Sequence, residues 1–227
     1  MADIADNLQK VRERIAAAEL RYHRQPGSVG LLAVSKSRSA AEIRAATACG
    51  QLDIGENYLQ EATGKMATLT GMEICWHFIG PVQSNKTRTI AETFTWVHSI
   101  DRIKIARRLN DMRPAGLPVL NVCIELNIDG EPSKSGIAAA ELRDFAAELR
   151  QYPRLRLRGL MAMPAASDDF EQQRDAFHRL YEYYRQLKSE DYHLDTLSMG
   201  TSGDMEAAIA EGSTMVRIGT AIFGPRP

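Results

Sequence analysis

Short β-type runs alternate with helix-type runs along almost the whole of this 227-residue chain, and this alternation constrains the fold more than any other feature. Eight runs have β-strand character: Gly30–Ser35, Gln51–Gly55, Glu73–Ile79, Trp96–Ser99, Val119–Asn127, Leu155–Met163, Leu194–Met199 and Met215–Gly219. The stretches between them carry helical patterns: Ala40–Cys49, Tyr58–Leu69, Ser84–Glu92, Ile103–Met112, Ala138–Gln151, Phe170–Ser189 and Met205–Glu211. Strands that alternate with helices form βαβ units, which build parallel sheets.

Eight such units in succession favour a closed (β/α)₈ barrel, the TIM barrel, over an open doubly wound sheet. A barrel of this kind takes roughly 200 to 250 residues, which fits the length of the chain. Ahead of the first strand, apolar residues at Ile4, Leu8, Val11 and Ile15 recur at helical spacing and predict a long amphipathic helix. No linker rich in Pro, Gly or Ser divides the sequence. We therefore expect one α/β domain over residues 1–227, an N-terminal helix followed by a barrel.

The fifth strand candidate, Val119–Asn127, supports the barrel because its residues alternate in character. Leu120, Val122, Ile124 and Leu126 would pack on helices, while Asn121, Cys123, Glu125 and Asn127 would line a more polar barrel interior. An exposed antiparallel edge strand gives a similar alternation, so this pattern supports the barrel without deciding it.

Composition excludes several classes of protein. The formal charge of −1 argues against a nucleic-acid-binding protein, which normally carries a basic excess. Three separated cysteines give neither a disulfide framework nor a zinc site, and no run of residues is apolar enough to serve as a signal peptide or membrane span. The five histidines form no HExxH or other metal-ligand spacing, so we expect no metal. These features are typical of a cytoplasmic protein.

Polar residues gather where the predicted strands end, at the rim that carries the active site in this fold. Lys36 closes the first strand. One interpretation is a lysine that extends its ammonium group out of the barrel end into solvent. The other is a desolvated amine with a depressed pKa, able to attack a carbonyl and form a Schiff base. Position alone does not separate these two interpretations.

Two loops at the same rim suit a phosphate group. Ser202 and Gly203 lie between the seventh strand and a predicted helix, and Gly219 and Thr220 follow the eighth strand. Loops after strands seven and eight are where this fold commonly binds phosphate through backbone N–H groups. The alternative is ordinary helix capping and turn formation, with Thr201 or Ser202 as the cap. Convergence of two loops favours phosphate.

Arg217 is predicted to point into the barrel, where a guanidinium group needs a partner. An ion pair with Glu125 or Asp53 would serve, and so would an acceptor on a bound ligand. His77 and His98 lie near strand ends and either contact a ligand or are structural. Met199 most simply fills core space.

These residues stand in motifs that resemble the pyridoxal phosphate homeostasis protein family from one end of the chain to the other. The motifs are AVSK at Ala33–Lys36, GENYLQE at Gly55–Glu61, WHFIGPVQSNK at Trp76–Lys86, HSIDR at His98–Arg102, SKSGI at Ser133–Ile137, RLRGLMAMP at Arg156–Pro164 and GSTMVRIGTAIFG at Gly212–Gly224. Two departures are small: Thr201 replaces a methionine of the phosphate loop, and the chain stops at Pro227 without a short basic tail.

The resemblance implies a fold-type III barrel like the N-terminal domain of alanine racemase, with pyridoxal 5'-phosphate (PLP) held by Lys36 as an internal aldimine. It implies phosphate contacts for Ser202, Gly219 and Thr220, with backbone contributions from Thr201 and Gly203. It also implies that Arg217 faces the pyridine nitrogen and keeps that nitrogen unprotonated. Three further residues are expected near the cofactor: Asn57, His77 and Met199.

The family resemblance further implies a monomer that buffers PLP and supplies it to other enzymes through transient contact, with no catalytic residues of its own. The chain is expected to end where the barrel closes, without the β-domain that supplies the second base of alanine racemase. The runner-up is a small amino-acid racemase with Tyr58 or His77 as a local second base. A phosphosugar-binding barrel without a cofactor is a third interpretation. Lys134 could capture a second aldehyde, but a solvated surface lysine is the simpler interpretation.

Overall fold

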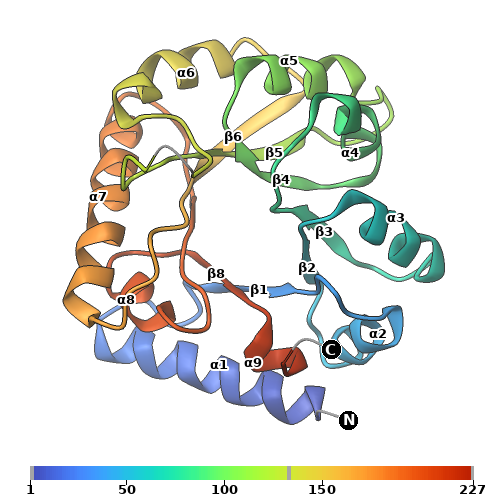
Figure 1. Cartoon of the computed structure of the whole chain (residues 1–227), viewed down its shortest axis with the longest axis vertical. Helices are drawn as coiled ribbons and strands as arrows, with labels where there is room; N and C mark the ends of the chain where they lie inside the picture. Colours follow the sequence, from blue (N-terminus) through green and yellow to red (C-terminus); the bar gives the residue numbers. More distant parts are fainter. Residues whose placement is uncertain (1–2, 132–133, 226–227) are drawn as a thin grey trace.

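Residues 3–131 and 134–225 are described by the computed structural model, in which eight parallel strands close into a barrel in the order of the sequence (Figure 1). The strands are β1 (Gly30–Val34), β2 (Asp53–Glu56), β3 (Cys75–Phe78), β4 (Trp96–Ile100), β5 (Leu120–Glu125), β6 (Leu155–Met161), β7 (Thr196–Ser198) and β8 (Met215–Ile218). Each lies within or close to a predicted run, and the pairing of β1 with β8 closes the barrel. The predicted TIM barrel is confirmed.

Helices surround this barrel (Figure 1). They are α1 (Ile4–Arg21), α2 (Ala40–Ala48), α3 (Leu59–Thr68), α4 (Thr87–Thr93), α5 (Ile103–Met112), α6 (Leu142–Leu149), α7 (Phe170–Ser189), α8 (Met205–Ala210) and α9 (Thr220–Phe223), with 3₁₀ turns η1 (Ser84–Lys86) and η2 (Ala139–Glu141) before α4 and α6. The short α9 was not predicted. Among the described residues, no helix combines the length and apolar character needed to cross a membrane.

Side chains placed just before the helices explain where several of them begin. The Asp3 carboxylate accepts hydrogen bonds from the backbone N–H groups of Ala5 and Asp6 in α1, and the Asp169 carboxylate accepts one from Gln172 in α7. Ser39 and Glu42 form a capping box at the start of α2, each bonding the backbone N–H of the other. These bonds satisfy N–H groups that have no partner inside the helix.

The apolar core has one large cluster between strands and helices and two small clusters inside the barrel. Leu120, Val122 and Ile124 of β5 belong to the large cluster between strands and helices. Cys123 instead packs against Trp96 and Met161 in a small cluster inside the barrel. The alternation predicted for this strand is therefore confirmed, and it sends Glu125, at the end of β5, into the interior near the carboxyl-terminal rim.

Some expectations extend to residues that the structure does not describe. Residues 1–2 and 226–227 at the ends of the expected domain lie outside the described part, as does Ser133 at the start of the SKSGI motif.

Candidate functional site

A cavity of about 240 Å³ opens where the strands end, and it joins residues from both halves of the sequence. Eight of the ten predicted site residues line it: Lys36, Asn57, Thr201, Ser202, Gly203, Arg217, Gly219 and Thr220. Four residues that were not predicted complete the lining: Val34, Arg38, Ile79 and Met163. The rim therefore brings a primary amine, two glycine-containing loops and a guanidinium group to one space.

Asn57 offers an observation that fits a ligand in this cavity. It follows β2, and its Oδ1 atom is buried without a hydrogen-bond partner among the described residues. A buried carbonyl oxygen without a donor costs about 1 to 3 kcal/mol, so such atoms are rare in folded proteins. A ligand with a donor group would satisfy it.

Hydrogen bonds between residues of the loop after β7 fix the conformation of that loop. The Asp204 carboxylate accepts hydrogen bonds from the backbone N–H of Thr201 at 2.5 Å and from its hydroxyl at 2.8 Å. Gly200 precedes them with φ +96°, and a Cβ there would lie 2.6 Å from Cβ of Ala208. Only glycine fits this approach. The loop therefore turns back tightly and brings Ser202 and Gly203 to the cavity.

Arg217 enters the cavity from β8 and is held by oxygens in β7 and directly after β6. Its Nη1 donates to the Ser198 carbonyl oxygen and to Ser198 Oγ at 2.9 Å, and its Nη2 donates to the Ala162 carbonyl oxygen at 3.0 Å. No carboxylate lies within ion-pair distance among the described residues, so the ion pair considered from the sequence is not formed. Burial lowers the pKa of Arg217 to about 10, and the charges of Asp204 and Glu125 oppose that shift.

Beneath Arg217, a chain of buried hydrogen bonds crosses the barrel interior. Ser198 Oγ lies 2.8 Å from His98 Nδ1, and His98 Nε2 lies 2.9 Å from His77 Nδ1. His77 Nε2 in turn lies 3.0 Å from Asp53 Oδ1, at the amino-terminal end of β2. We call this set, with Arg217 at its upper end, the interior chain. It was not predicted.

The two ends of the interior chain determine where its protons lie. A guanidinium group only donates, and an ionised carboxylate only accepts. Burial acts to raise the pKa of Asp53, but its hydrogen bonds with His77 and Cys75 and its charge interaction with His77 together lower the pKa. Burial lowers the pKa of His77 and, with the charges of His77 and Arg217, lowers that of His98 well below its ordinary value. With both rings neutral, every hydrogen bond in the chain donates from the Arg217 end towards Asp53.

Two predicted site residues do not line the cavity. His77 is fully buried one layer below the rim, and Ile79, directly after β3, takes the position facing the cavity. Met199 is also fully buried, on the outer side of the barrel in the large core cluster. Cys75 joins His77 and Asp53 at the far end of the barrel, where their ligand-type atoms lie within 4.8 Å of one another and are engaged in hydrogen bonds.

A second cavity of about 300 Å³ adjoins the first and shares Asn57, Ile79 and Met163 with it. Lys134 lines this second cavity with its ammonium group 2.8 Å from Asp129 and 3.5 Å from Glu131. It is therefore neither a free amine nor a fully solvated side chain.

Glu125 also lines the second cavity, and its burial has a consequence for stability. Burial raises its pKa from 4.5 to about 7; the Asp101 charge adds to this and the Arg217 charge opposes it. Between these pH values the folded chain keeps a proton that the unfolded chain has lost. The proton on Glu125 therefore stabilises the folded chain at low pH. As pH rises from 4.5 through 7 this stabilisation is lost, and the free energy of unfolding should fall by about 3 kcal/mol.

Glu125→Gln should remove that loss, which urea denaturation between pH 4.5 and 8 would measure. The variant should match the wild type at the acid end and exceed it above pH 7. His77 and His98 act in the opposite sense in both proteins, since their lowered pKa values weaken the fold as pH falls below about 6.5. Parallel curves for the variant and the wild type would contradict the raised pKa of Glu125.

Comparison with known proteins gives this geometry its context. The family described as "Alanine racemase, N-terminal domain" matches residues 2–227. A protein of Pseudomonas aeruginosa named pyridoxal phosphate homeostasis protein is 57% identical over 226 residues, covering 100% of this chain and 97% of that protein. A protein of Escherichia coli K12 with the same name is 54% identical, covering 100% and 98%. The chain belongs to the pyridoxal phosphate homeostasis protein family.

Solved structures agree with this assignment. PipY of Synechococcus elongatus, solved with PLP bound, has a TM-score of 0.86 at 35% identity and covers 97% of this chain and 100% of its own. Alanine racemase of Corynebacterium glutamicum shares the fold, with a TM-score of 0.73 at 19% identity over 99% of this chain and 61% of that enzyme. PipY and this alanine racemase thus share the barrel of this chain, and the resemblance stated from the motifs is confirmed.

Proposed function

We propose that the chain binds PLP in the rim cavity through Lys36 and serves as a carrier of the cofactor. The observation that carries this proposal is that Lys36 lines the same cavity as the two loops after β7 and β8. The hydroxyl groups of Ser202 and Thr220 and the backbone at Gly203 and Gly219 would hold the phosphate. The PLP bound by PipY supports the choice of ligand.

The chemistry required of the cavity is the formation of one imine bond. When bound, PLP would supply an aldehyde carbon, and the Lys36 amine would hold the cofactor there through an imine bond, with loss of one water. Arg217 would hold the pyridine nitrogen as a hydrogen-bond donor, because its guanidinium group stays charged at neutral pH. A donor that cannot release its proton leaves the ring nitrogen unprotonated and the ring a weak electron sink.

The position of possible second bases favours a carrier over a racemase. A racemase needs acid–base groups on both faces of its substrate. His77 is buried below the cavity, and Tyr58 is exposed and is not part of its lining in the described chain. Lys36 alone would serve one face. We therefore propose that the chain holds PLP as a monomer and releases it to apo-enzymes on transient contact, without turnover of its own.

Lys36→Ala is the test of PLP binding. Wild-type protein mixed with PLP should develop the visible absorbance of an aldimine, and borohydride should fix the cofactor to Lys36 in a peptide map. Lys36→Ala should lose both signals because no other amine lines the cavity among the described residues. An unchanged absorbance in the variant would overturn the assignment of Lys36.

The carrier role is tested on the same loaded protein. Holo-protein should reactivate an apo-enzyme faster than free cofactor does when a trap for free PLP is present. Incubation with L- and D-alanine should give no sustained stereoinversion. Stereoinversion that disappears in Lys36→Ala would establish the racemase instead.

A further inference from the structure

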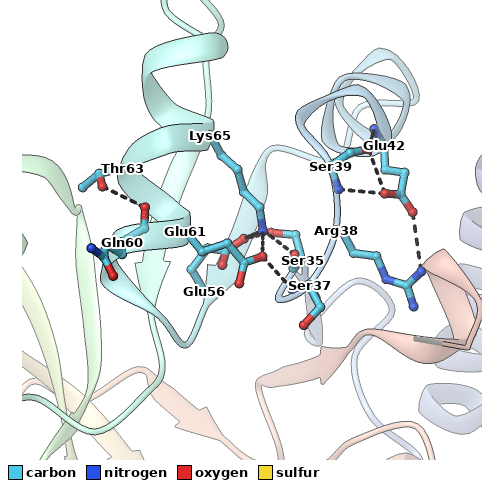
Figure 2. A network of polar contacts seen from close by, with 10 residues as sticks. All are labelled: Ser35, Ser37, Arg38, Ser39, Glu42, Glu56, Gln60, Glu61, Thr63 and Lys65. Atoms are coloured by element: carbon cyan, nitrogen blue, oxygen red, sulfur yellow. Dashed lines mark hydrogen bonds and ion pairs between the residues drawn. The ribbon is translucent and has the colours of Figure 1, made fainter. Parts of the chain in front are cut away.

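The loop that carries Lys36 is tied to its surroundings on both sides (Figure 2). It runs from Ser35, just after β1, to Ser39, the cap of α2. On one side, Arg38 donates to the carbonyl oxygens of Gly224 at 2.5 Å and Pro225 at 2.8 Å, and its guanidinium group lies 3.5 Å from Glu42. On the other side lies α3, whose side chains reach the residues directly before and after Lys36.

Lys65 of α3 is the centre of that second set of contacts. It is buried, and its ammonium group donates to the Ser35 carbonyl oxygen at 2.6 Å, to Glu56 at 2.5 Å and to Glu61 at 2.5 Å. An ammonium group has three protons, so these three bonds use all of them. The Ser35 hydroxyl also donates to Glu56, at the end of β2. The cation thereby joins the ends of two strands to one helix.

Glu61 extends the same network to the residue after Lys36. Its carboxylate accepts a hydrogen bond from the backbone N–H of Ser37 at 2.6 Å. Ser37 has φ +60°, a conformation that costs a non-glycine residue free energy and persists only where its surroundings impose it. The bond to Glu61 is one such constraint, and it is fixed in place by Lys65.

These contacts act on the two peptide groups that flank Lys36. The Ser35 carbonyl belongs to the peptide group before Lys36, and the Ser37 N–H belongs to the peptide group after it. Because each peptide group is planar, fixing both sets the φ and ψ angles of Lys36 and the direction of its Cα–Cβ bond. A network that served stability alone would not need to reach both groups.

We propose that Lys65, acting through Glu56 and Glu61, is a positioning residue that aims the Lys36 side chain into the rim cavity. The proposal rests on the proposed function, since it assigns the network to the presentation of a reactive amine. Lys65 does not line the cavity and therefore takes no part in the reaction itself.

Two variants test it without leaving a buried carboxylate unpaired. Lys65→Met combined with Glu56→Gln removes the cation and the buried charge together, and the glutamine carbonyl can still accept from Ser35. Glu61→Ala removes the acceptor of the Ser37 N–H. In stopped-flow mixing with PLP, both should slow the rise of visible absorbance by about 10- to 100-fold, the usual cost of a misplaced reacting group. Glu61→Gln keeps a carbonyl oxygen and should recover much of the rate.

The affinity for pyridoxine 5'-phosphate distinguishes a loss of Lys36 positioning from damage to the cavity. This compound carries the ring and phosphate of PLP but no aldehyde, so its affinity should be unchanged in every variant that retains the wild-type circular dichroism. Arg88→Ala is the control: it removes an exposed i,i+4 ion pair of α4, in which Nη1 of Arg88 lies 3.7 Å from Glu92, and should leave both measurements unchanged.

Normal rates in the α3 variants, or an equal loss of affinity for pyridoxine 5'-phosphate, would overturn the positioning role. Failure of the wild-type protein itself to form the absorbance band would instead overturn the proposed function. The two failures are therefore distinguishable.

Discussion

Gly159→Ala is expected to lower the free energy of unfolding by more than about 4 kcal/mol, an exceptional loss for which overpacking of the core is one of the few causes. Gly159 of β6 pairs with Thr196 of β7, and a Cβ atom at Gly159 would lie 1.6 Å from the Thr196 carbonyl oxygen. Both groups are strand backbone, so neither can rotate away. The two strands would have to separate, and Arg217, which bonds carbonyl oxygens after β6 and in β7, would lose its anchors.

Gly64→Ala is the matched control. Gly64 lies inside α3, and nothing lies within 4 Å of the position of an added Cβ. Alanine should therefore stabilise the protein by about 0.5 to 1 kcal/mol through helix propensity. Urea denaturation would compare the two variants. A Gly159→Ala protein as stable as the wild type would show that β6 and β7 separate without cost, which the close pairing excludes.

The barrel could be predicted because short β-type runs alternate with helix-type runs along almost the whole chain. In a parallel barrel all carboxyl-terminal strand ends meet at one rim, so residues that follow strands must be neighbours. This reasoning brought Lys36 and Arg217 together although they lie at opposite ends of the chain, and one cavity contains both. The four-residue helix α9 could not be predicted, since it is too short to show periodicity.

His77 and Met199 show that a position near the end of a strand does not by itself predict that a side chain reaches the rim. Strand side chains alternate between inside and outside, and the inward-facing ones form successive layers. Which layer reaches the rim depends on where the strand ends in space. Ile79, directly after β3, reaches the rim in place of His77, and the loop beginning at Gly200, after β7, reaches it in place of Met199. Met163, two residues after the end of β6, was not predicted at the site, but it lines the cavity.

Hydrogen bonds between residues far apart in the sequence also could not be predicted from the sequence. His98 and Ser198 are 100 residues apart, and only the register of several strands sets them at hydrogen-bond distance. Glu61 and Lys65 have i,i+4 spacing on a predicted helix, but their reach to Ser35 and Ser37 depends on how α3 packs beside β1 and β2.

His98→Phe is expected to destabilise the protein by about 2 to 6 kcal/mol, because it leaves two buried groups without partners at about 1 to 3 kcal/mol each. Phenylalanine keeps a ring of similar size beside Trp96, whose ring centre lies 5.6 Å away. The Ser198 hydroxyl then has no acceptor and His77 Nδ1 has no donor. Because every hydrogen bond of the interior chain donates in one direction, no reorientation of the remaining members can compensate.

Asp53→Ala should lower the free energy of unfolding much less, by below about 1 kcal/mol. The Asp53 side chain is 47% exposed, so water can replace the carboxylate as acceptor for His77.

A double variant tests the coupling between Ser198 and His98. Adding Ser198→Ala to His98→Phe removes one of the two unpartnered groups, so the double variant should lose less free energy of unfolding than the sum of the losses in the two single variants. Chemical denaturation of the wild type, His98→Phe, Ser198→Ala and the double variant gives the coupling free energy. Strict additivity would contradict a continuous hydrogen-bonded chain beneath Arg217.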